Sequence, residues 1–279
     1  MGCATGCDFD WYKAGVSDSP DYILCHLMGG FEMSSVVSSR PRHGYAEAAD
    51  VVIGDRRLCS VQWGGNTGDR VMVESSGFEA PRLASLVRSE WPQHHLLRAD
   101  VAIDIDLPDA WDSLSSMALN LADKYDLKTR HVGDYHRAKE GRSIYVGSRQ
   151  SSVMLRVYEK GIEQRVKGIS DDTSVDLVRV ETEIKPKKSV ARMHCATLSP
   201  SELLGCAPFT TEMAKILLDE SVERVVGLNR LKRPSDRDRA LAAMVKQYGK
   251  HLDSLRSEEG SWAAVGDALG RMLEGSKGR

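Results

Sequence analysis

Four segments of this sequence alternate between apolar and polar residues, and this pattern limits the fold more than any other feature. Successive side chains of a β-strand point to opposite faces. Residues 96–106, 143–147, 153–160 and 177–185 would therefore each form a strand with one apolar and one polar face. Strands buried on both sides are apolar throughout. The pattern predicts a mainly antiparallel sheet with helices on one face and a polar face open to a ligand.

Strands are expected in the first two thirds of the chain and helices after them. Further strands are predicted at residues 7–13, 45–53, 57–63 and 70–75. Helices are predicted at 20–28, 81–91, 108–125, 199–204, 210–226, 235–255 and 262–273, a short helix or loop at 161–168, and a basic loop at 126–140. This order indicates the α+β class. We expect a sheet-based domain at residues 1–186 and a helical C-terminal region at 187–279 packed on it.

Composition excludes several classes of protein. The 38 Lys and Arg residues against 40 Asp and Glu give a net charge of −2, so nucleic-acid binding would need a local basic patch. No apolar run reaches the roughly 18 residues of a membrane span, and no apolar signal core is present at the N-terminus. The six cysteines have no zinc-binding spacing, which favours reduced thiols and a cytoplasmic location.

A tyrosine stands between two cations in the segment 153–160. Arg156, Tyr158 and Lys160 are spaced to share the polar face of that strand. A phenol titrates near pH 10 and becomes a useful nucleophile where nearby positive charge favours the phenolate. We therefore expect Tyr158 to be a nucleophile assisted by Arg156 and Lys160. A half-buried structural tyrosine is the alternative.

The same polar face gathers acidic residues from two strands. These predicted metal ligands are Asp100, Asp104, Glu181 and Glu183. Neighbouring carboxylates repel unless they share a cation, and their hard oxygens suit Mg²⁺ or Mn²⁺. Such an ion would stabilise the charge that develops on a phosphodiester. Salt bridges to Arg98, Arg156, Lys160 and Arg179 would account for the same carboxylates without a metal, and both interpretations stay open.

Aromatic residues lie within a basic stretch at residues 128–149. Tyr135 and Tyr145 are surrounded there by Lys and Arg, a combination typical of single-stranded DNA binding. A solvated charged face is the alternative. The residues that we expect to contact DNA are Arg137, Lys139, Arg142, Arg149 and Arg179.

Three blocks in order, LRADVAIDID, GRSIYVGSRQSSVMLRVYEKGIEQ and VRVETEIKPKK, resemble the replication initiation factor family. This family comprises the rolling-circle initiators of small plasmids and filamentous phages, and the resemblance extends in weaker form from residue 8 to 248. It implies an endonuclease and strand transferase that nicks one strand of hairpin origin DNA. Like a relaxase, such an enzyme would use a tyrosine as its nucleophile. It further implies a covalent 5′-phosphotyrosine, a free 3′ hydroxyl, a divalent ion, and recruitment of a bacterial host's replicative helicase and polymerase.

The resemblance places the nucleophile at Tyr158 and the acids at Asp100, Asp104, Glu181 and Glu183. The chain lacks the His-apolar-His motif of another class of initiators, so a bound Mg²⁺ or Mn²⁺ would rest on carboxylates. A homodimer is one option for its assembly. Two other functions stay open. One is a non-enzymatic DNA-binding repressor or replication accessory protein, and the other is a nuclease that uses metal-activated water.

Overall fold

The computed structural model describes residues 6–65, 70–136, 140–169, 172–218 and 236–276 of the chain. Contacts along the chain divide it into two units, Met1–Asn229 and Arg230–Arg279. The boundary expected at residue 186 separates strands from helices, but the first helices after it belong to the first unit. Whether residues 1–186 and 187–279 behave as separate domains stays a prediction.

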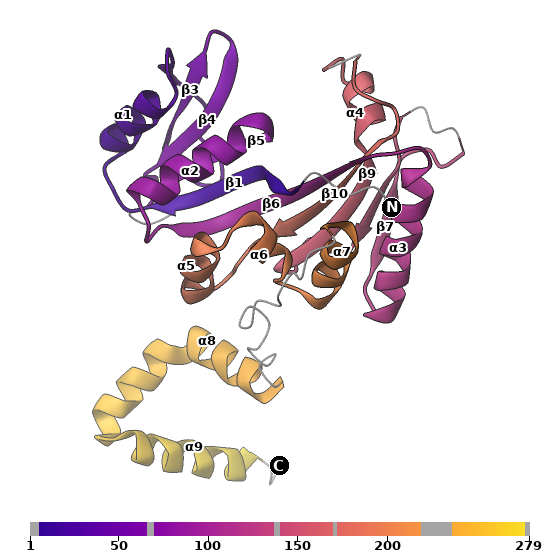
Figure 1. The fold of residues 1–279 in the computed structure, drawn as a ribbon. Coiled ribbons are helices and arrows are strands. Elements are labelled where there is room, and N and C mark those ends of the chain that lie inside the picture. Colours follow the sequence, from indigo (N-terminus) through magenta and orange to yellow (C-terminus); the bar gives the residue numbers. More distant parts are fainter. Residues whose placement is uncertain (1–5, 66–69, 137–139, 170–171, 219–235, 277–279) are drawn as a thin grey trace. The chain divides into compact units, whose positions relative to one another are not determined.

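A ten-stranded antiparallel sheet forms the centre of the first unit (Figure 1). Its strands are β1 (Asp8–Val16), β2 (Ser35–Ser38), β3 (Glu47–Ile53), β4 (Arg56–Trp63), β5 (Val71–Ser76), β6 (His95–Asp106), β7 (Thr129–Val132), β8 (Ser143–Val146), β9 (Val153–Glu159) and β10 (Leu177–Ile184). They lie in the order β2-β3-β4-β5-β1-β6-β10-β9-β8-β7, and each neighbouring pair is antiparallel. The predicted α+β class with a mainly antiparallel sheet is confirmed.

Helices follow and interrupt these strands. Those of the first unit are α1 (Pro20–Gly30), the 3-10 turn η2 (Gly77–Glu79), α2 (Ala80–Glu90), α3 (Ala110–Lys124), α4 (Lys160–Val166), α5 (Ser189–Thr197), α6 (Pro200–Leu204) and α7 (Pro208–Leu218). In α3 the buried residues Trp111, Leu114, Ala118 and Leu121 recur at helical spacing, so one side of the helix faces the sheet at β8 to β10. α2 packs on β1, and α5 and α6 pack on β6.

The alternation of the strands decides which side chains enter the core. Val101 and Ile103 on β6, and Leu155 and Val157 on β9, are buried in the hydrophobic cluster beneath the helices. Their neighbours in sequence point to the other face of the sheet, where α4 contacts β10. The predicted division into a helix-covered apolar face and a polar face is therefore present.

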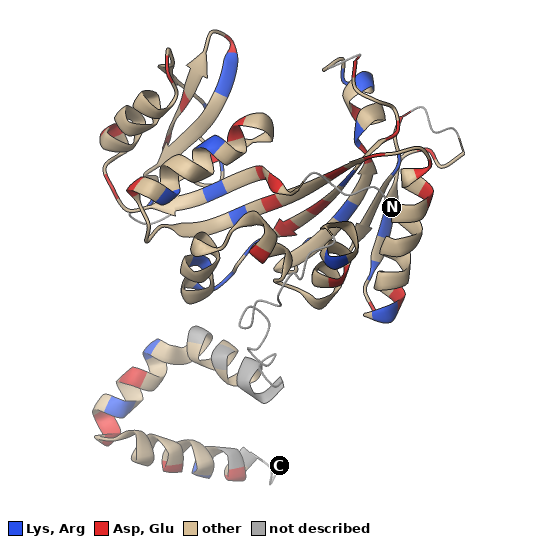
Figure 2. Ribbon diagram, in the orientation of Figure 1, with Lys and Arg blue, Asp and Glu red and all other residues tan. Residues whose placement is uncertain are grey.

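Pairing registers bring the polar residues of three strands together. β10 lies between β6 and β9, and Arg179 is opposite both Asp104 on β6 and Tyr158 on β9. Four residues further along β10, Glu183 is opposite Asp100. Figure 2 shows acidic and basic segments side by side on these central strands.

Some elements differ from those predicted. Thr129–Val132 forms the edge strand β7 within the stretch expected to be a loop, because it pairs with β8. β2 and α5 were not predicted. Lys160 is the first residue of α4 and does not extend β9. The turn into α4 depends on Gly161, where a Cβ would lie 1.8 Å from the backbone oxygen of Ser174.

The second unit consists of α8 (Asp236–Glu259) and α9 (Trp262–Ser276) as far as it is described. The two helices contact each other and are joined at Gly260, whose φ of +84° suits glycine. The predicted helices at 235–255 and 262–273 correspond to them. None of the described helices, in either unit, combines the length and the apolar character that crossing a membrane requires.

Candidate active site

Tyr158 lies on the polar face of the sheet near the end of β9. Its hydroxyl donates a hydrogen bond to Oε2 of Glu181 on β10, at 3.2 Å. The guanidinium of Arg156 lies over its ring, 3.7 Å from the ring centre, and Nζ of Lys160 is 5.5 Å from that centre. Tyr158 is only 2% exposed. The phenol, a carboxylate and two cations thus meet on one face, as expected, but the phenol is covered by its charged neighbours.

This burial changes the acid-base chemistry of Tyr158. Burial raises the pKa of its phenol above the ordinary value of 10, and the charge of Glu181 raises it further. Arg179 and Arg156 lower the same pKa by less. The cations therefore act on the phenol in the expected direction, but in this arrangement the loss of water around the phenol outweighs their charge.

Glu181 is the natural proton acceptor for this phenol. Burial raises the pKa of its carboxyl to about 7, with Asp100 as the next cause, while Arg156 lowers the pKa. Among the described residues, Glu181 makes no ion pair with a basic side chain, and the Tyr158 hydroxyl is its hydrogen-bond partner. A carboxyl with a pKa near neutrality can accept and return a proton at physiological pH.

Arg179 holds two carboxylates beside this pair. Its Nε and Nη2 donate to the two carboxylate oxygens of Asp104, each at 2.6 Å, and its Nη1 donates to Asp10. Only 14% of the Arg179 side chain is exposed. Burial, the largest single cause, lowers the pKa of the guanidinium, but its hydrogen bonds to Asp104 and the charge of Asp10 raise the pKa above the ordinary value. Arg179 therefore stays charged next to the tyrosine.

Arg98 holds a second pair of acids. Its Nε and Nη2 donate to the two oxygens of Asp100 at 2.8 and 2.5 Å, and Nη2 lies 3.1 Å from Glu183. Nζ of Lys185 is 2.6 Å from the other oxygen of Glu183. Burial raises the pKa of Asp100 to about 6, although Arg98 lowers it. Salt bridges, the alternative to a metal site, thus pair Asp100 within β6 and pair Asp104 and Glu183 across strands.

The predicted metal ligands do not fit a divalent ion as they are arranged here. Their oxygens are of the kind that Mg²⁺ and Mn²⁺ prefer. Within the described part of the chain, however, no three Asp, Glu, His or Cys side chains converge as metal ligands would. The Arg179 guanidinium lies between Asp10 and Asp104, so an ion could bind both carboxylates only after that side chain moved away.

Asp10 was not predicted as a site residue. Counting alternately from the buried Tyr12 would put Asp10 on the apolar face. A β-bulge leaves Asp10 without a register partner, since Phe9 is opposite Val101 and Trp11 is opposite Asp100. The extra residue lets Phe9 pack on Tyr12 in the core while Asp10 reaches Arg179. The only signal in the sequence was a second acid placed between the aromatic residues Phe9 and Trp11.

Comparison with known proteins now bears on this face. Residues 95–219 match the replication initiation factor family. The match covers somewhat less than half of the chain and runs from β6 to α7. It therefore includes Tyr158, Glu181, Arg179 and Asp100, but not Asp10 on β1. The resemblance to the replication initiation factor family, predicted from three blocks of sequence, is confirmed.

A solved structure resembles the chain over a longer span. It is that of a rolling circle replication initiator protein from Geobacillus stearothermophilus, with a TM-score of 0.51 and 16% identity. The alignment covers 78% of this chain and 99% of that one. At this identity the likeness shows a shared fold. Comparison with curated protein sequences gave no significant match.

The residues expected to contact DNA are only partly brought together. Exposed Arg149 lies over the ring of Tyr145, and Arg156 lies over the same ring, so a line of cations and aromatics leads from the β8–β9 turn to Tyr158. This line lies on the polar face, and all of its residues are within the stretch that matches the replication initiation factor family. Arg137 and Lys139 lie outside the described residues.

Arg142 is on the other side of the sheet. Its side chain donates to both carboxylate oxygens of Glu159, at 3.0 and 2.6 Å, and lies over the ring of Trp111 in α3. Glu159 follows Tyr158 in β9, so it points to the opposite face. The structure therefore places Arg142, which was expected to contact DNA, on the face of the sheet opposite to Tyr158.

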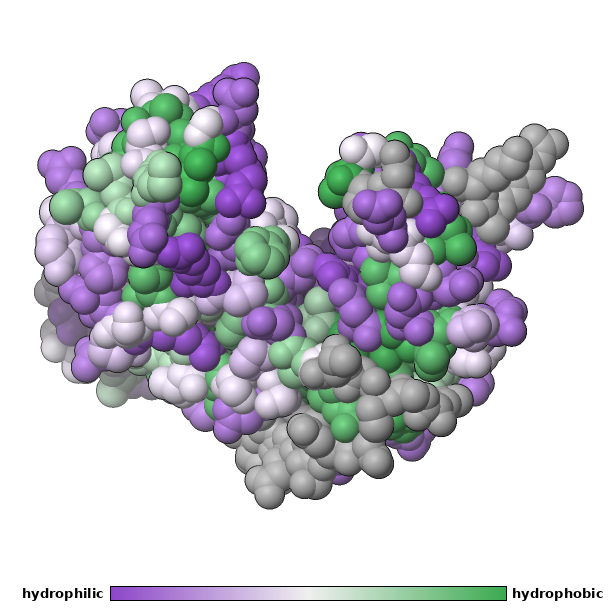
Figure 3. Space-filling view, turned by 45° about the horizontal axis from the view of Figure 1, so that its top comes forward, coloured by the Kyte–Doolittle hydropathy of each residue, from purple (hydrophilic) through white to green (hydrophobic). Residues whose placement is uncertain are grey.

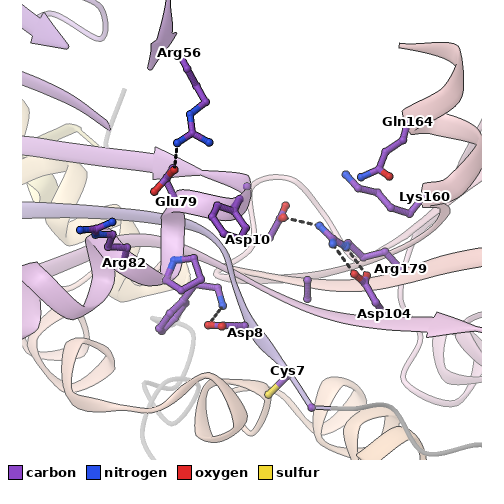
Figure 4. A pocket seen from close by; sticks show the side chains of 16 residues that line it. Cys7, Asp8, Asp10, Arg56, Glu79, Arg82, Asp104, Lys160, Gln164 and Arg179 are labelled. Carbon is purple, nitrogen blue, oxygen red and sulfur yellow. Dashed lines mark hydrogen bonds and ion pairs between the residues drawn. The ribbon is translucent and has the colours of Figure 1, made fainter. Parts of the chain in front are cut away.

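A cavity of about 920 Å³ opens beside the tyrosine. Figure 4 shows Lys160, Gln164 and Arg179 on one side of it and Arg56 and Glu79 on the other. Tyr158 itself does not line the cavity, but Lys160 and Arg179 line it and are also next to Tyr158. In Figure 3 this part of the molecule is hollowed between two raised parts, and the hollow is mostly hydrophilic. A charged ligand could thus reach the immediate neighbours of Tyr158 from this cavity.

Proposed function

We propose that this protein initiates rolling-circle replication by nicking and rejoining one strand of origin DNA through Tyr158. The observation that carries the proposal is the hydrogen bond from Tyr158 to Glu181 on a face rich in arginine, next to an open cavity. The match to the replication initiation factor family supports the same function. A phenol with a proton acceptor and cations beside it has the parts needed for attack on a phosphodiester.

The proposed step balances as an exchange of two phosphate esters. Glu181 accepts the phenolic proton while the Tyr158 oxygen forms a bond to phosphorus. The bond from phosphorus to the 3′ oxygen breaks, and that oxygen takes a proton from water to become a 3′ hydroxyl. The 5′ phosphate stays on Tyr158 as a phosphotyrosine. Attack by a 3′ hydroxyl reverses the step and rejoins the strand, because the ester bond is conserved.

Arg156 has two roles in this proposal. It covers the Tyr158 ring in the absence of DNA, and its buried Nε has no hydrogen-bond partner among the described residues. A buried donor without a partner is costly, so a phosphate oxygen that accepts from it would be favoured. Drawing Arg156 towards the phosphate would also uncover the phenol. Lys160 and Arg179 would offset the remaining phosphate charge.

The dependence on Mg²⁺ or Mn²⁺ implied by the family is also a proposal. The two acids that Arg179 holds, Asp104 and Asp10, both line the cavity and could hold an ion that enters with the DNA. Such binding requires Arg179 to release them. Asp100 and Glu183 would then remain with Arg98 as the structural ion-paired cluster.

The partners implied by the family complete the proposal. They are origin DNA in a single-stranded or hairpin form, the host replicative helicase and polymerase, and a second copy of the chain. Recruitment of the polymerase would follow nicking, since a 3′ hydroxyl is what a polymerase extends.

One observation favours a second candidate function. Tyr158 is almost fully buried and its pKa is raised, which also suits a structural tyrosine in a DNA-binding repressor or replication accessory protein without chemistry. Such a protein would bind the origin with a steep dependence on salt and form no adduct.

Formation of the adduct tests the choice between them. Labelled hairpin oligonucleotides, designed from candidate inverted repeats in the DNA of the same replicon, are incubated with protein and Mn²⁺ or Mg²⁺, then run on a denaturing gel. We expect a covalent adduct with the wild type and with Tyr145→Phe, but none with Tyr158→Phe, which should still bind the DNA. An adduct with Tyr158→Phe would overturn the assignment of the nucleophile. Salt-sensitive binding without an adduct for any protein would favour the repressor.

A further inference from the structure

An exposed aromatic ring lies in the cavity beside the active site. Phe78, in the turn η2, lines the cavity and is 89% exposed. Exposing a phenyl ring to water is unfavourable, and because so little of Phe78 is buried, packing offsets only a small part of that cost. A single exposed apolar residue on a surface is ordinary, but this ring shares its cavity with Lys160 and Arg179. The combination of an aromatic face and cations is the one that binds nucleotides.

The turn that presents Phe78 is fixed at both ends. Ser76 before it belongs to β5 and is opposite Trp11 of β1. Gly77 has a φ of +68°, a left-handed conformation that glycine adopts without strain and that turns the chain out of the strand. After Phe78, the carboxylate of Glu79 is buried and accepts an ion pair from Nη2 of Arg56 at 2.9 Å. The ring is therefore held on a defined turn.

The charges of the cavity indicate where a nucleotide would lie. Lys160 and Arg179 are next to Tyr158, so a phosphate near the phenol would be held on that side. The base attached to it could then extend along the cavity towards Phe78. The volume of about 920 Å³ lies within the range of pockets for small ligands, roughly 300–1,000 Å³, and leaves room for a nucleotide.

We propose that Phe78 stacks on an unpaired base of the origin strand next to the phosphate attacked by Tyr158. This inference rests on the proposed function. It assigns to the cavity beside Tyr158 a nucleotide of the origin strand whose base is unpaired and lies outside the duplex. The face of a phenyl ring can stack only on a base whose own face is accessible, so a paired and stacked base would not fit. Phe78 would thereby help to position the phosphate, and it would not take part in the chemistry.

Equilibrium binding tests this proposal without any need for cleavage. All proteins carry Tyr158→Phe, and the probes are single-stranded oligonucleotides of the same candidate origin sequences, each with 2-aminopurine at one position. Stacking on an aromatic ring quenches 2-aminopurine fluorescence. We expect quenching at one or two adjacent positions, which Phe78→Ala should abolish while weakening binding on the order of tenfold. Phe78→Trp should keep both. The matched control, Met33→Ala, removes an exposed apolar residue that does not line the cavity and should change neither.

Each outcome bears on one of the two proposals. Unchanged quenching and affinity in Phe78→Ala would overturn the stacking role, as would an equal loss in Met33→Ala. An equal dependence on Phe78 with fully duplex probes would overturn the assignment of an unpaired base. Absence of an adduct in the wild type would count against the proposed nicking alone, because the stacking is measured in proteins that cannot form one. Thermal unfolding of Phe78→Ala should match that of its parent, since the ring is exposed.

Discussion

The guanidinium of Arg156 lies 3.7 Å from the centre of the Tyr158 ring, and the Tyr158 hydroxyl points to Glu181. The tyrosine is thus held between a cation over its face and a proton acceptor at its tip. This arrangement keeps water from the phenol, raises its pKa and makes its release dependent on movement of Arg156.

Removal of Arg156 should expose the phenol. In the wild type we expect tetranitromethane to nitrate Tyr22 and Tyr135, which are 47% and 42% exposed, and to leave Tyr158 unmodified. In Arg156→Ala, Tyr158 should become modified, because its ring loses its cover. Peptide mass mapping measures this, with Tyr22 and Tyr135 as internal standards. Protection of Tyr158 in the variant would mean that other groups bury it.

The rate of nicking should depend on ionisation of Glu181. Since the pKa of this carboxyl is raised to about 7, its basic form predominates only above neutrality, and kcat/KM should rise through pH 7 and then level off. Glu181→Gln should lower the rate by about 10²- to 10⁴-fold and remove this inflection. Glu74→Gln, which alters an ion pair with Lys13 on the same sheet, is the control and should keep the wild-type profile. A wild-type rate that is flat between pH 5 and 9 would exclude Glu181 as the base.

The same carboxyl should limit stability at high pH. Its pKa is higher in the folded protein, about 7, than its ordinary value of 4.5, so the folded state binds the proton more tightly. The resulting stabilisation is complete below pH about 4.5 and is lost as pH rises through 7. Glu181→Gln should therefore raise the free energy of unfolding by about 1–3 kcal/mol at pH 8 and by almost nothing at pH 4.5. Urea denaturation at both pH values measures the difference, and an equal effect at both would contradict it.

Replacing Arg179 should create a cation site. Arg179→Ala leaves Asp10 and Asp104 without their shared guanidinium and should cost about 1–3 kcal/mol, below the value for a fully buried pair because Asp104 is partly exposed. Millimolar Mn²⁺ should then raise the Tm of this variant more than that of the wild type. Lys13→Ala, which leaves a single carboxylate, is the control and should gain no more than the wild type. An equal gain in the wild type would place the ion elsewhere.

The junction of β9 and α4 should tolerate only glycine at position 161. A Cβ there would lie 1.8 Å from the Ser174 oxygen and 3.1 Å from the Val175 Cα, so Gly161→Ala must push α4 or the following segment away. We expect a loss of about 1–3 kcal/mol in thermal or urea unfolding. Gly266→Ala, within α9, meets nothing within 4 Å and should be neutral or slightly stabilising. Equal effects of the two would contradict the close contact.

The sequence by itself determined the strands and their faces. Alternation along residues 96–106, 153–160 and 177–185 put Asp100, Tyr158 and Glu181 on the polar face, because the period of a strand is a local property of the backbone. It also carried the resemblance to the replication initiation factor family, since each of the three blocks includes most or all of one of these strands.

Only the tertiary structure decided how those residues are used. Pairing partners that are distant in the chain determined that Arg179 lies between Asp104 and Asp10, and a bulge in β1 that alternation cannot foresee turned Asp10 towards it. Burial by these neighbours reversed the expected effect on the pKa of Tyr158. The physical reason is that charge pairing and loss of solvent depend on distances between segments, whereas alternation depends only on neighbours in sequence.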